Sequence, residues 1–350
     1  MSAAFANRLR APRARSGGFT LIELLVAMII GLVVVLAAAA ALMVSRSSFT
    51  TVDSASQLRD NARFAADMIQ RISVQTGYRD TYFAAQAVTA GGPPRTPDIT
   101  GYDNAKIVLP TPPAVTLPTR SARSSTEVGY GSDVLILSYQ AARIYPALKP
   151  DGSPNTQSDQ SMIDCAGNAP ATVPDFSVST ALSTRITSIF HVDIDQGEPS
   201  LMCTYQDPVT GNWTTAPIVQ GVENFQVLYG VDGVTTGTDP ASTAPAPEVP
   251  LTYLRADQMN GATPTGTNAN WTRVRALRIG MVVRSAPNSA QDSASQTYYP
   301  FGATPSGSTA AVGSAFSSTQ DVNSAFTPTP DGRLRQVATF TIHLRNDQGL

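Results

Sequence analysis

Residues 18–44 read GFTLIELLVAMIIGLVVVLAAAAALMV, an apolar run that contains a single charge, Glu23. From Leu24 to Ser45 no charged residue occurs. About 20 apolar residues cover a hydrocarbon core of roughly 30 Å, so this run is long enough to span a membrane. A carboxylate in a membrane-spanning helix is energetically costly, and Glu23 therefore needs a partner or a function.

A short basic leader precedes the apolar run. It contains no acidic residue and four arginines, Arg8, Arg10, Arg13 and Arg15. This charge predicts that the leader stays in the cytoplasm and that the chain after Arg46 lies outside. A secretory signal has an apolar region of about 7–15 residues followed by its cleavage site, whereas here the small residues Gly17 and Gly18 come before a longer run. Cleavage is expected before the apolar segment, which leaves the membrane helix in the mature chain.

The junction Gly-Phe-Thr-Leu-Ile-Glu at residues 18–23 resembles the processing site of type IV prepilins and type II secretion pseudopilins. The resemblance implies cleavage between Gly18 and Phe19 by the prepilin peptidase, N-methylation of Phe19, and packing of the apolar segments in the centre of a helical filament. It also implies that Glu23 neutralises the terminal amine of a neighbouring subunit. The physics agrees, because a buried carboxylate and ammonium attract strongly while either alone is costly. The alternative is a single-pass anchor with Glu23 near the membrane interface.

The helical period continues beyond the membrane segment. Residues three or four apart form one apolar stripe: Val52, Ala55, Leu58, Ala62, Ala65, Ile69 and Ile72. No proline occurs in residues 19–92, and Gly77 is suited to end a helix. We therefore expect one helix from Phe19 to about Thr76, roughly 85 Å long, whose second half buries its stripe against a globular head. Gly31 either lets this helix bend or allows close helix packing, and both interpretations stay open.

After residue 80 the composition changes to Thr, Ser, Pro, Gly and Val, which favours strands and long loops. Candidate strands cover residues 132–139, 188–194, 200–205, 218–229, 272–283 and 336–344. The second and third, joined by residues 195–199, are expected to form a hairpin. No regular structure is predicted for residues 91–120, 235–250, 260–270 and 286–330, the last of which is of low complexity. The prediction is an α+β fold, with the long N-terminal helix packed on one β-rich head.

The chain contains two cysteines, Cys165 and Cys203, both on the expected outer side of the membrane, where oxidation is permitted. A disulfide between them is predicted, and closing a loop of this size contributes about 4 kcal/mol by the chain-entropy argument. Two unpaired, buried thiols are the alternative, because the sequence does not show whether the geometry suits a disulfide.

Several short segments are similar, in order and spacing, to landmarks of PilW-type minor pilins. They are residues 61–65 (NARFA), 77–78 (GY), 132–135 (SDVL), 164–168 (DCAGN), 201–203 (LMC), 222–230 (VENFQVLYG) and 271–279 (WTRVRALRI). The resemblance implies a type IV pilin-like fold and a low-abundance subunit that joins other minor pilins in a complex that primes pilus assembly at the filament tip. Residues 91–120 and 286–330 depart from the family pattern and leave an adhesive role open.

An enzyme is not predicted. His191 and His343 each fall in a candidate strand, where a histidine is more often structural, and no Cys-x-x-Cys, His-Glu-x-x-His, Walker loop or nucleophile elbow occurs. The oxygen-rich stretch at residues 193–198 resembles a fragment of a calcium loop. Because the full ligand pattern is missing, we expect a solvated hairpin turn there, and we predict neither a metal nor another cofactor.

Nucleic acid is not an expected partner either. Seven arginines lie between residue 273 and the last residue of the sequence: Arg273, Arg275, Arg278, Arg284, Arg333, Arg335 and Arg345. However, removing the four arginines of the leader changes the formal charge from −2 to −6, and an acidic head lacks the general attraction that drives phosphate binding. These arginines are instead expected to bridge to neighbouring pilins.

The sequence therefore predicts a non-enzymatic filament subunit, built from a leader (1–18), a membrane and filament-core helix (19–45), its amphipathic continuation (46–77) and a head (78–350). It is expected in the inner membrane with its head in the periplasm, and then in an extracellular pilus. Expected partners are membrane lipid, the prepilin peptidase and methyltransferase, the inner-membrane assembly platform, the major pilin and other minor pilins. The alternatives are a large type II secretion pseudopilin and a membrane-anchored adhesin or sugar-binding module that never enters a filament.

Overall fold

The computed structural model describes residues 18–80, 96–173, 185–240, 249–290, 294–302 and 325–346. Contacts divide the chain into two compact units, Met1–Val52 and Asp53–Leu350. The predicted leader, apart from Gly18, lies outside the described residues, as does the stretch 303–324 within the low-complexity segment.

The helix α1 (Leu21–Gln75) begins in the first unit and ends in the second. Five members of the predicted stripe are buried: Leu58, Ala62, Ala65, Ile69 and Ile72. Val52, at the start of the stripe, is 66 % exposed and lies in the first unit. Gly77 follows the helix with a φ of 76°, a conformation that glycine adopts readily, and so ends it where the sequence predicts. The expected long helix is confirmed.

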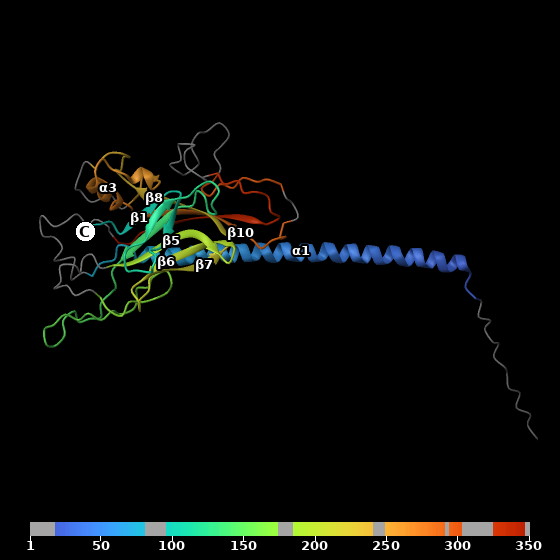
Figure 1. The fold of residues 1–350 in the computed structure, drawn as a ribbon, viewed down its shortest axis with the longest axis horizontal. Helices are drawn as coiled ribbons and strands as arrows, with labels where there is room; N and C mark the ends of the chain where they lie inside the picture. Colours follow the sequence, from blue (N-terminus) through green and yellow to red (C-terminus); the bar gives the residue numbers. More distant parts are fainter. Residues whose placement is uncertain are drawn as a thin grey trace, which may run out of the picture. The chain divides into compact units, whose positions relative to one another are not determined.

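Two antiparallel sheets and a two-stranded ladder form the described part of the head (Figure 1). The first sheet has the order β1 (Ile99–Tyr102), β4 (Val134–Tyr139), β5 (Ile186–Asp195), β6 (Glu198–Gln206), β7 (Trp213–Gln220). The second has the order β11 (Arg335–His343), β10 (Ala276–Arg284), β8 (Val222–Val231), β9 (Thr252–Leu254). The ladder pairs β2 (Ala105–Val108) with β3 (Thr119–Ala122), and the short helices are η2 (Asp257–Met259) and α3 (Pro264–Trp271).

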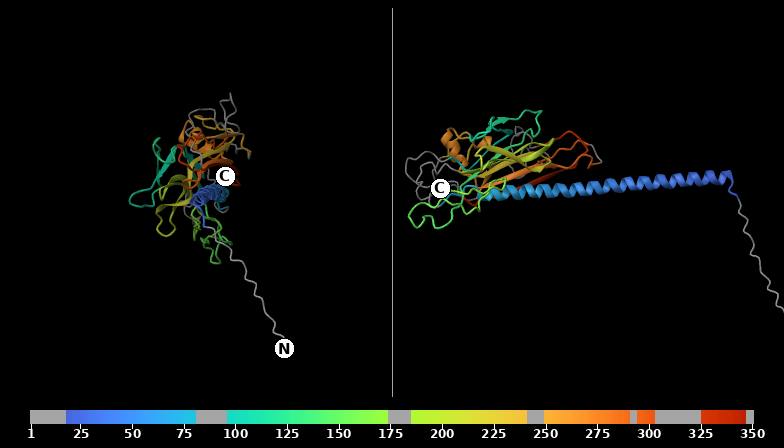
Figure 2. Two further views of the ribbon diagram at one scale, coloured as in Figure 1. Left: turned by 90° about the vertical axis from the view of Figure 1, so that its right-hand side faces the viewer. Right: turned by 60° about the horizontal axis from the view of Figure 1, so that its bottom comes forward.

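One hydrophobic core joins the C-terminal part of α1 to both sheets. Ile69 and Ile72 belong to the same buried cluster as Phe190 of β5 and Phe225 of β8. In both views of Figure 2 the sheets lie on one side of the last turns of α1. Burying a side chain of this size contributes about 1.5–3 kcal/mol, so packing on the sheets, more than helix propensity, stabilises this half of α1. The predicted α+β arrangement is confirmed.

Four candidate strands, 132–139, 188–194, 200–205 and 336–344, correspond to β4, β5, β6 and β11. The predicted hairpin is also present, with Gln196 and Gly197 at positive φ between β5 and β6. The prediction of one strand over 218–229 is wrong, because Gly221 separates β7 from β8 and the two strands belong to different sheets. Gly221 has a φ of 87°, and a Cβ there would lie 2.4 Å from the carbonyl oxygen of Arg284. Strand-forming residues on both sides hide this turn from pattern analysis.

The candidate strand over 272–283 begins too early, since β10 starts at Ala276 after the helix α3. No regular structure is predicted over 260–270, yet α3 lies there. Thr263 caps this helix by accepting a hydrogen bond from the backbone N–H of Gly266 at 2.9 Å, and Pro264 occupies its first turn. Similarly, the unassigned segment 91–120 contains β1, β2 and the start of β3. These short elements gain their stability from the tertiary fold.

Candidate functional site

The predicted processing and assembly residues lie just before α1 and in its first turn. Gly18 and Phe19 precede the helix, and Phe19 is 89 % exposed. The backbone N–H and the hydroxyl of Thr20 each donate to one carboxylate oxygen of Glu23 at 2.9 Å, and the N–H of Glu23 donates to the Thr20 hydroxyl at 3.3 Å. These reciprocal contacts form a capping box, in which Glu23 binds backbone at the start of its own helix.

The role of Thr20 is missing from the sequence predictions, although a detectable signal exists. A Thr followed three residues later by Glu, just before an apolar run, is the pattern of a capping box. The same pattern places the carboxylate of Glu23 beside the backbone of Thr20, the second residue after the predicted cleavage bond. An anionic group is stabilised at this end of a helix by the orphan N–H groups and the helix dipole. The arrangement can therefore hold a carboxylate close to a newly formed amine on Phe19.

The apolar residues that follow Glu23 have no cover within the described chain. Leu24, Ile29 and Leu36 are 58 %, 61 % and 60 % exposed. By length and composition α1 is the one described helix able to cross a membrane, with a mean hydropathy of 3.0 in its most apolar window. A Cβ built on Gly31 meets no atom within 4 Å, so any close packing at this glycine involves other molecules. An exposed apolar surface of this kind is stable only when lipid or other apolar helices cover it.

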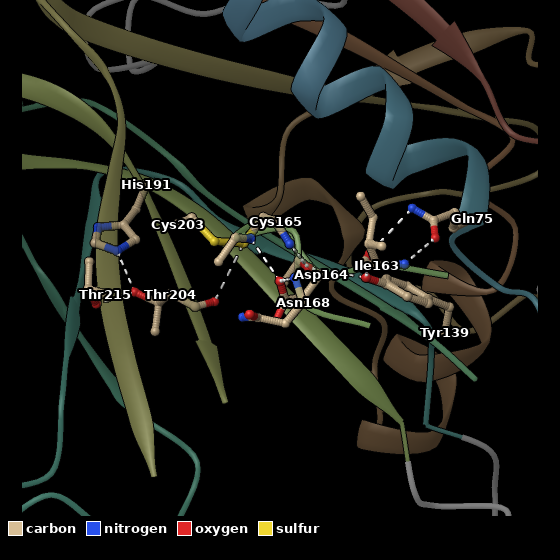
Figure 3. The surroundings of a disulfide bond; sticks show 12 residues. Gln75, Tyr139, Ile163, Asp164, Cys165, Asn168, His191, Cys203, Thr204 and Thr215 are labelled. Atoms are coloured by element: carbon tan, nitrogen blue, oxygen red, sulfur yellow. Dashed lines mark hydrogen bonds between the residues drawn. A yellow bond between two sulfur atoms is a disulfide. The ribbon is translucent and has the colours of Figure 1, made fainter. Parts of the chain in front are cut away.

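In the head, Cys165 and Cys203 form the predicted disulfide, with their Cα atoms 5.8 Å apart (Figure 3). Cys165 lies in the connection between β4 and β5, and Cys203 lies in β6. The backbone N–H of Cys165 also donates to the Ser188 hydroxyl at 3.0 Å. The disulfide and this hydrogen bond together attach the connection between β4 and β5 to the central strands of the first sheet.

The residues next to Cys165 contact the end of α1. The side-chain amide of Gln75 accepts a hydrogen bond from the N–H of Ile163 at 2.9 Å and donates to its carbonyl at 3.4 Å. The hydroxyl of Tyr139 donates to the same carbonyl. The carboxylate of Asp164 accepts hydrogen bonds from the backbone of Asn168 and its side-chain amide at 2.9 and 3.0 Å. Figure 3 shows these contacts side by side. The disulfide and the end of α1 therefore restrain the same loop, which contains residues 163–168.

His191 lies buried on β5, near the disulfide. Its Nε2 is 2.8 Å from the hydroxyl of Thr204, while its Nδ1 has no partner within the described chain. Burial lowers the pKa of His191 to about 4, against a partial opposing effect of Asp193. The histidine is therefore neutral at physiological pH. With a threonine hydroxyl as its partner, it is a packed, structural side chain in this fold.

Three of the arginines expected to bridge to neighbouring pilins instead pair with acidic residues of this chain, which corrects that prediction. Arg284 lies 2.7 Å from Glu198 and 2.9 Å from Glu223. Arg333 also binds Glu198, and Arg335 binds Glu223. Hydrogen bonding from Arg333 first, and then from Arg284, holds the pKa of Glu198 below its usual range. Sequence spacing gives no sign of these pairs, because they join residues 61 to 135 positions apart.

The stretch that resembles a calcium loop forms the tight turn between β5 and β6. Glu198 points its carboxylate at two arginines, and Asp195 accepts a hydrogen bond from Gln220 at 2.9 Å. In the part of the chain that the structure describes, no group of three or more His, Cys, Asp or Glu side chains is arranged to hold a metal ion.

Comparison with known proteins gives two family matches. Residues 189–346 match the family described as Type IV Pilus-assembly protein W, and residues 13–39 match the prokaryotic N-terminal methylation motif. No curated protein matches the sequence. Among solved structures, the type IV-like pilin TTHA1219 from Thermus thermophilus is similar at 14 % identity and a TM-score of 0.32, over 82 % of this chain and 96 % of that one. The two family matches fall on the second half of the head and on the capped apolar helix, and they support a type IV pilus minor pilin of the PilW type.

Proposed function

We propose that this pilin enters a type IV filament after removal of residues 1–18 and methylation of Phe19, that it primes filament assembly with other minor pilins, and that it sits at the filament tip. It is a structural subunit without catalytic activity. The observation that carries the proposal is the first turn of α1, where Thr20 and Glu23 form a polar, capped start to an otherwise exposed apolar helix.

The exposed apolar side chains support two successive environments for residues 19–45. Lipid of the inner membrane covers them first, with the arginine-rich leader in the cytoplasm and the head in the periplasm. The helices of other pilins cover them in the filament. A disulfide in the head is consistent with an oxidising compartment. The prepilin peptidase, the methyltransferase and the assembly platform act on the membrane-bound form.

Glu23 provides the assembly contact. Cleavage after Gly18 creates an amine on Phe19, the neighbour of Thr20, and Thr20 already binds the carboxylate. A carboxylate that meets an ammonium among apolar helices is stabilised only when the two charges pair, which favours one register between subunits. The capping contacts hold Glu23 until the amine of a neighbouring subunit reaches it.

The first experiment compares the N-terminal peptide from sheared surface filaments with that from inner membrane by mass spectrometry. A methylated peptide that begins at Phe19 in the filament fraction is the expected result. An intact leader, with the protein confined to the membrane, would overturn the filament proposal and favour an anchored binding protein.

Two variants separate the charge of Glu23 from its capping role. Glutamine also serves in a capping box, so Glu23→Gln keeps the helix cap and removes the charge. We expect Glu23→Gln to be processed yet to be absent from filaments. Thr20→Val removes the reciprocal cap and keeps the carboxylate, and we expect it to enter filaments. Normal incorporation of Glu23→Gln would exclude charge pairing as the assembly contact.

The priming role and the tip position need their own readouts. Deletion of the gene is expected to reduce the number of surface pili strongly, and a labelled head is expected at one end of each filament. Label along the whole shaft would contradict the tip position. Intact pili and motility together with lost enzyme export would indicate a type II secretion pseudopilin.

A further inference from the structure

A cleft of about 490 Å³ lies between the β1–β3 region and the η2–α3 region of the head. Its walls come from segments more than 100 residues apart in the sequence, and Figure 1 shows α3 beside β1. Ligand sites in proteins usually have volumes of about 300–1,000 Å³, so the cleft is large enough for a small organic molecule. None of the predicted site residues of this pilin lines it.

The two walls are fastened to each other. The carboxylate of Asp103, in the turn after β1, accepts hydrogen bonds from the backbone N–H groups of Ala256 and Asp257 at 3.1 and 2.7 Å. On the β3 side, the guanidinium of Arg120 lies 3.5 Å from the ring centroid of Tyr102. The polar groups around the cleft therefore stand in place before a ligand arrives, which lowers the entropic cost of binding.

Several polar groups at the cleft have no partner. The hydroxyl of Ser121, which lines it, is buried and makes no hydrogen bond within the described chain. The fully buried hydroxyl of Tyr229 also has none, and it lies directly behind the lining residue Gly101, where a Cβ would stand only 1.8 Å from it. Trp271 lines the cleft and packs edge-on against Tyr229, with ring centroids 4.7 Å apart. Unpaired hydroxyls of this kind are costly unless water or a ligand satisfies them.

The charges around the cleft are largely balanced. Asp257 pairs with Arg255 at 3.0 Å, and Asp103 already accepts two backbone N–H groups. Burial, with a smaller contribution from Asp257, raises the pKa of Asp103 to about 7, which reduces its negative charge further. Two engaged carboxylates give a metal ion too few free ligands, and with Arg120 as the other charged residue of the lining neither sign of charge dominates.

The lining favours a neutral ligand with many hydroxyl groups. The side-chain amides of Asn260 and Asn268 and the hydroxyls of Thr267 and Ser121 can both donate and accept hydrogen bonds, as a sugar hydroxyl can. Tyr102, which is partly exposed and has Arg120 over its ring, supplies apolar surface for the C–H groups of a pyranose ring, and Trp271, which is 5 % exposed, adds only a small part of its ring. We propose that this cleft binds a saccharide of one or two rings. The binding does not depend on where the subunit sits in a filament.

The test uses the full-length protein in a zwitterionic detergent that carries no sugar headgroup. The probe is an array of host-cell and bacterial-surface glycans. The expected result is retention of one related group of neutral glycans. A complete lack of retention, or retention of charged glycans alone that salt abolishes, would overturn the proposal.

Asn268→Ala is the diagnostic variant, because the Asn268 side chain lines the cleft and its amide has no partner within the described chain. We expect it to weaken glycan binding about tenfold. Asn212→Ala is the matched control, since Asn212 is also partly buried and lies in the β6–β7 turn outside the cleft. Equal binding by Asn268→Ala and the unaltered protein, or equal loss in both variants, would contradict a saccharide site here.

Two further measurements keep the test independent of folding defects. Ser121→Ala removes a hydroxyl that has no partner within the described chain, so it is expected to weaken glycan binding without lowering the thermal midpoint. The chain contains two tryptophans, and Trp213→Phe leaves Trp271 as the sole indole in the protein. Its fluorescence is expected to change in a saturable way as the retained glycan is added. A constant signal at saturating glycan would place the binding elsewhere and overturn the proposal.

Discussion

The side-chain amide of Gln75 brackets the peptide group of Ile163, accepting from its N–H at 2.9 Å and donating to its carbonyl at 3.4 Å. Gln75 is the last residue of α1, and Ile163 lies two residues before the disulfide. The contact joins two parts of the chain 88 residues apart. It attaches the end of α1 to the disulfide-bonded loop.

Replacing Gln75 by Ala is expected to lower the free energy of unfolding of the head by about 1–2 kcal/mol, because the partly buried peptide of Ile163 loses both partners from the helix. Denaturant unfolding followed by tryptophan fluorescence measures the change. Gln57→Ala is the control, since Gln57 binds the exposed Asp53 at 3.0 Å, and we expect a change within about 0.5 kcal/mol. Equal effects of the two variants would mean that the Gln75 contact adds nothing specific.

Removal of the disulfide by the double substitution Cys165→Ser and Cys203→Ser is expected to destabilise the head by about 4 kcal/mol, from the chain entropy of a loop with a sequence separation of 38. Hydrogen exchange at the Ile163 amide is expected to accelerate, because the loop is then held chiefly by Gln75 and Tyr139. Unfolding curves of the oxidised, reduced and doubly substituted proteins test this. A reduced protein as stable as the oxidised one would show that side-chain packing alone holds the loop.

The burial of His191 predicts that the stability of the head falls at acid pH. Its pKa of about 4 in the fold lies below the 6.5 of a free histidine, so between these values the unfolded chain binds a proton that the folded chain does not. The contribution of the neutral histidine is complete above pH 6.5 and is lost as the pH falls towards 4. His191→Gln is expected to remove about 2 kcal/mol of the stability lost between pH 7 and pH 4.5.

The control for His191 is His343→Gln, because His343 is exposed on β11. Denaturant unfolding at several pH values compares both variants with the unaltered protein. The His343→Gln curve is expected to parallel that of the unaltered protein. Parallel curves for all three proteins would show that acid destabilisation comes from other groups.

Glu223 is the central carboxylate between Arg284 and Arg335, at 2.9 and 2.5 Å, and its side chain is 9 % exposed. Glu223→Gln is expected to cost about 2–3 kcal/mol of stability, because it leaves Arg284 of β10 and Arg335 of β11 without this charge partner. Glu127→Gln is the control, since Glu127 pairs with Lys106 near the surface and is expected to contribute little. Thermal unfolding measures both, and equal shifts in midpoint would contradict a special role for the buried pair.

Much of this molecule follows from local residue order. The membrane helix, its capped carboxylate, the end at Gly77 and the β5–β6 hairpin depend on hydrophobic period, caps and turns within a few residues of each other. The capping role of Thr20 was within reach of the same rules. The match of residues 13–39 to the methylation motif concerns this local part.

The structure of the head depends on contacts between residues far apart in the chain, and local residue order does not reveal these contacts. Gly221 ends a strand because its φ of 87° and the nearby carbonyl of Arg284 allow no side chain there. The arginines pair within the chain because β10 and β11 lie beside the turn that carries Glu198. The cleft exists because Asp103 and Asp257, 154 residues apart, meet across two regions. Such pairings depend on how distant segments pack, and the free energy of burying a shared core, rather than any local preference, selects them.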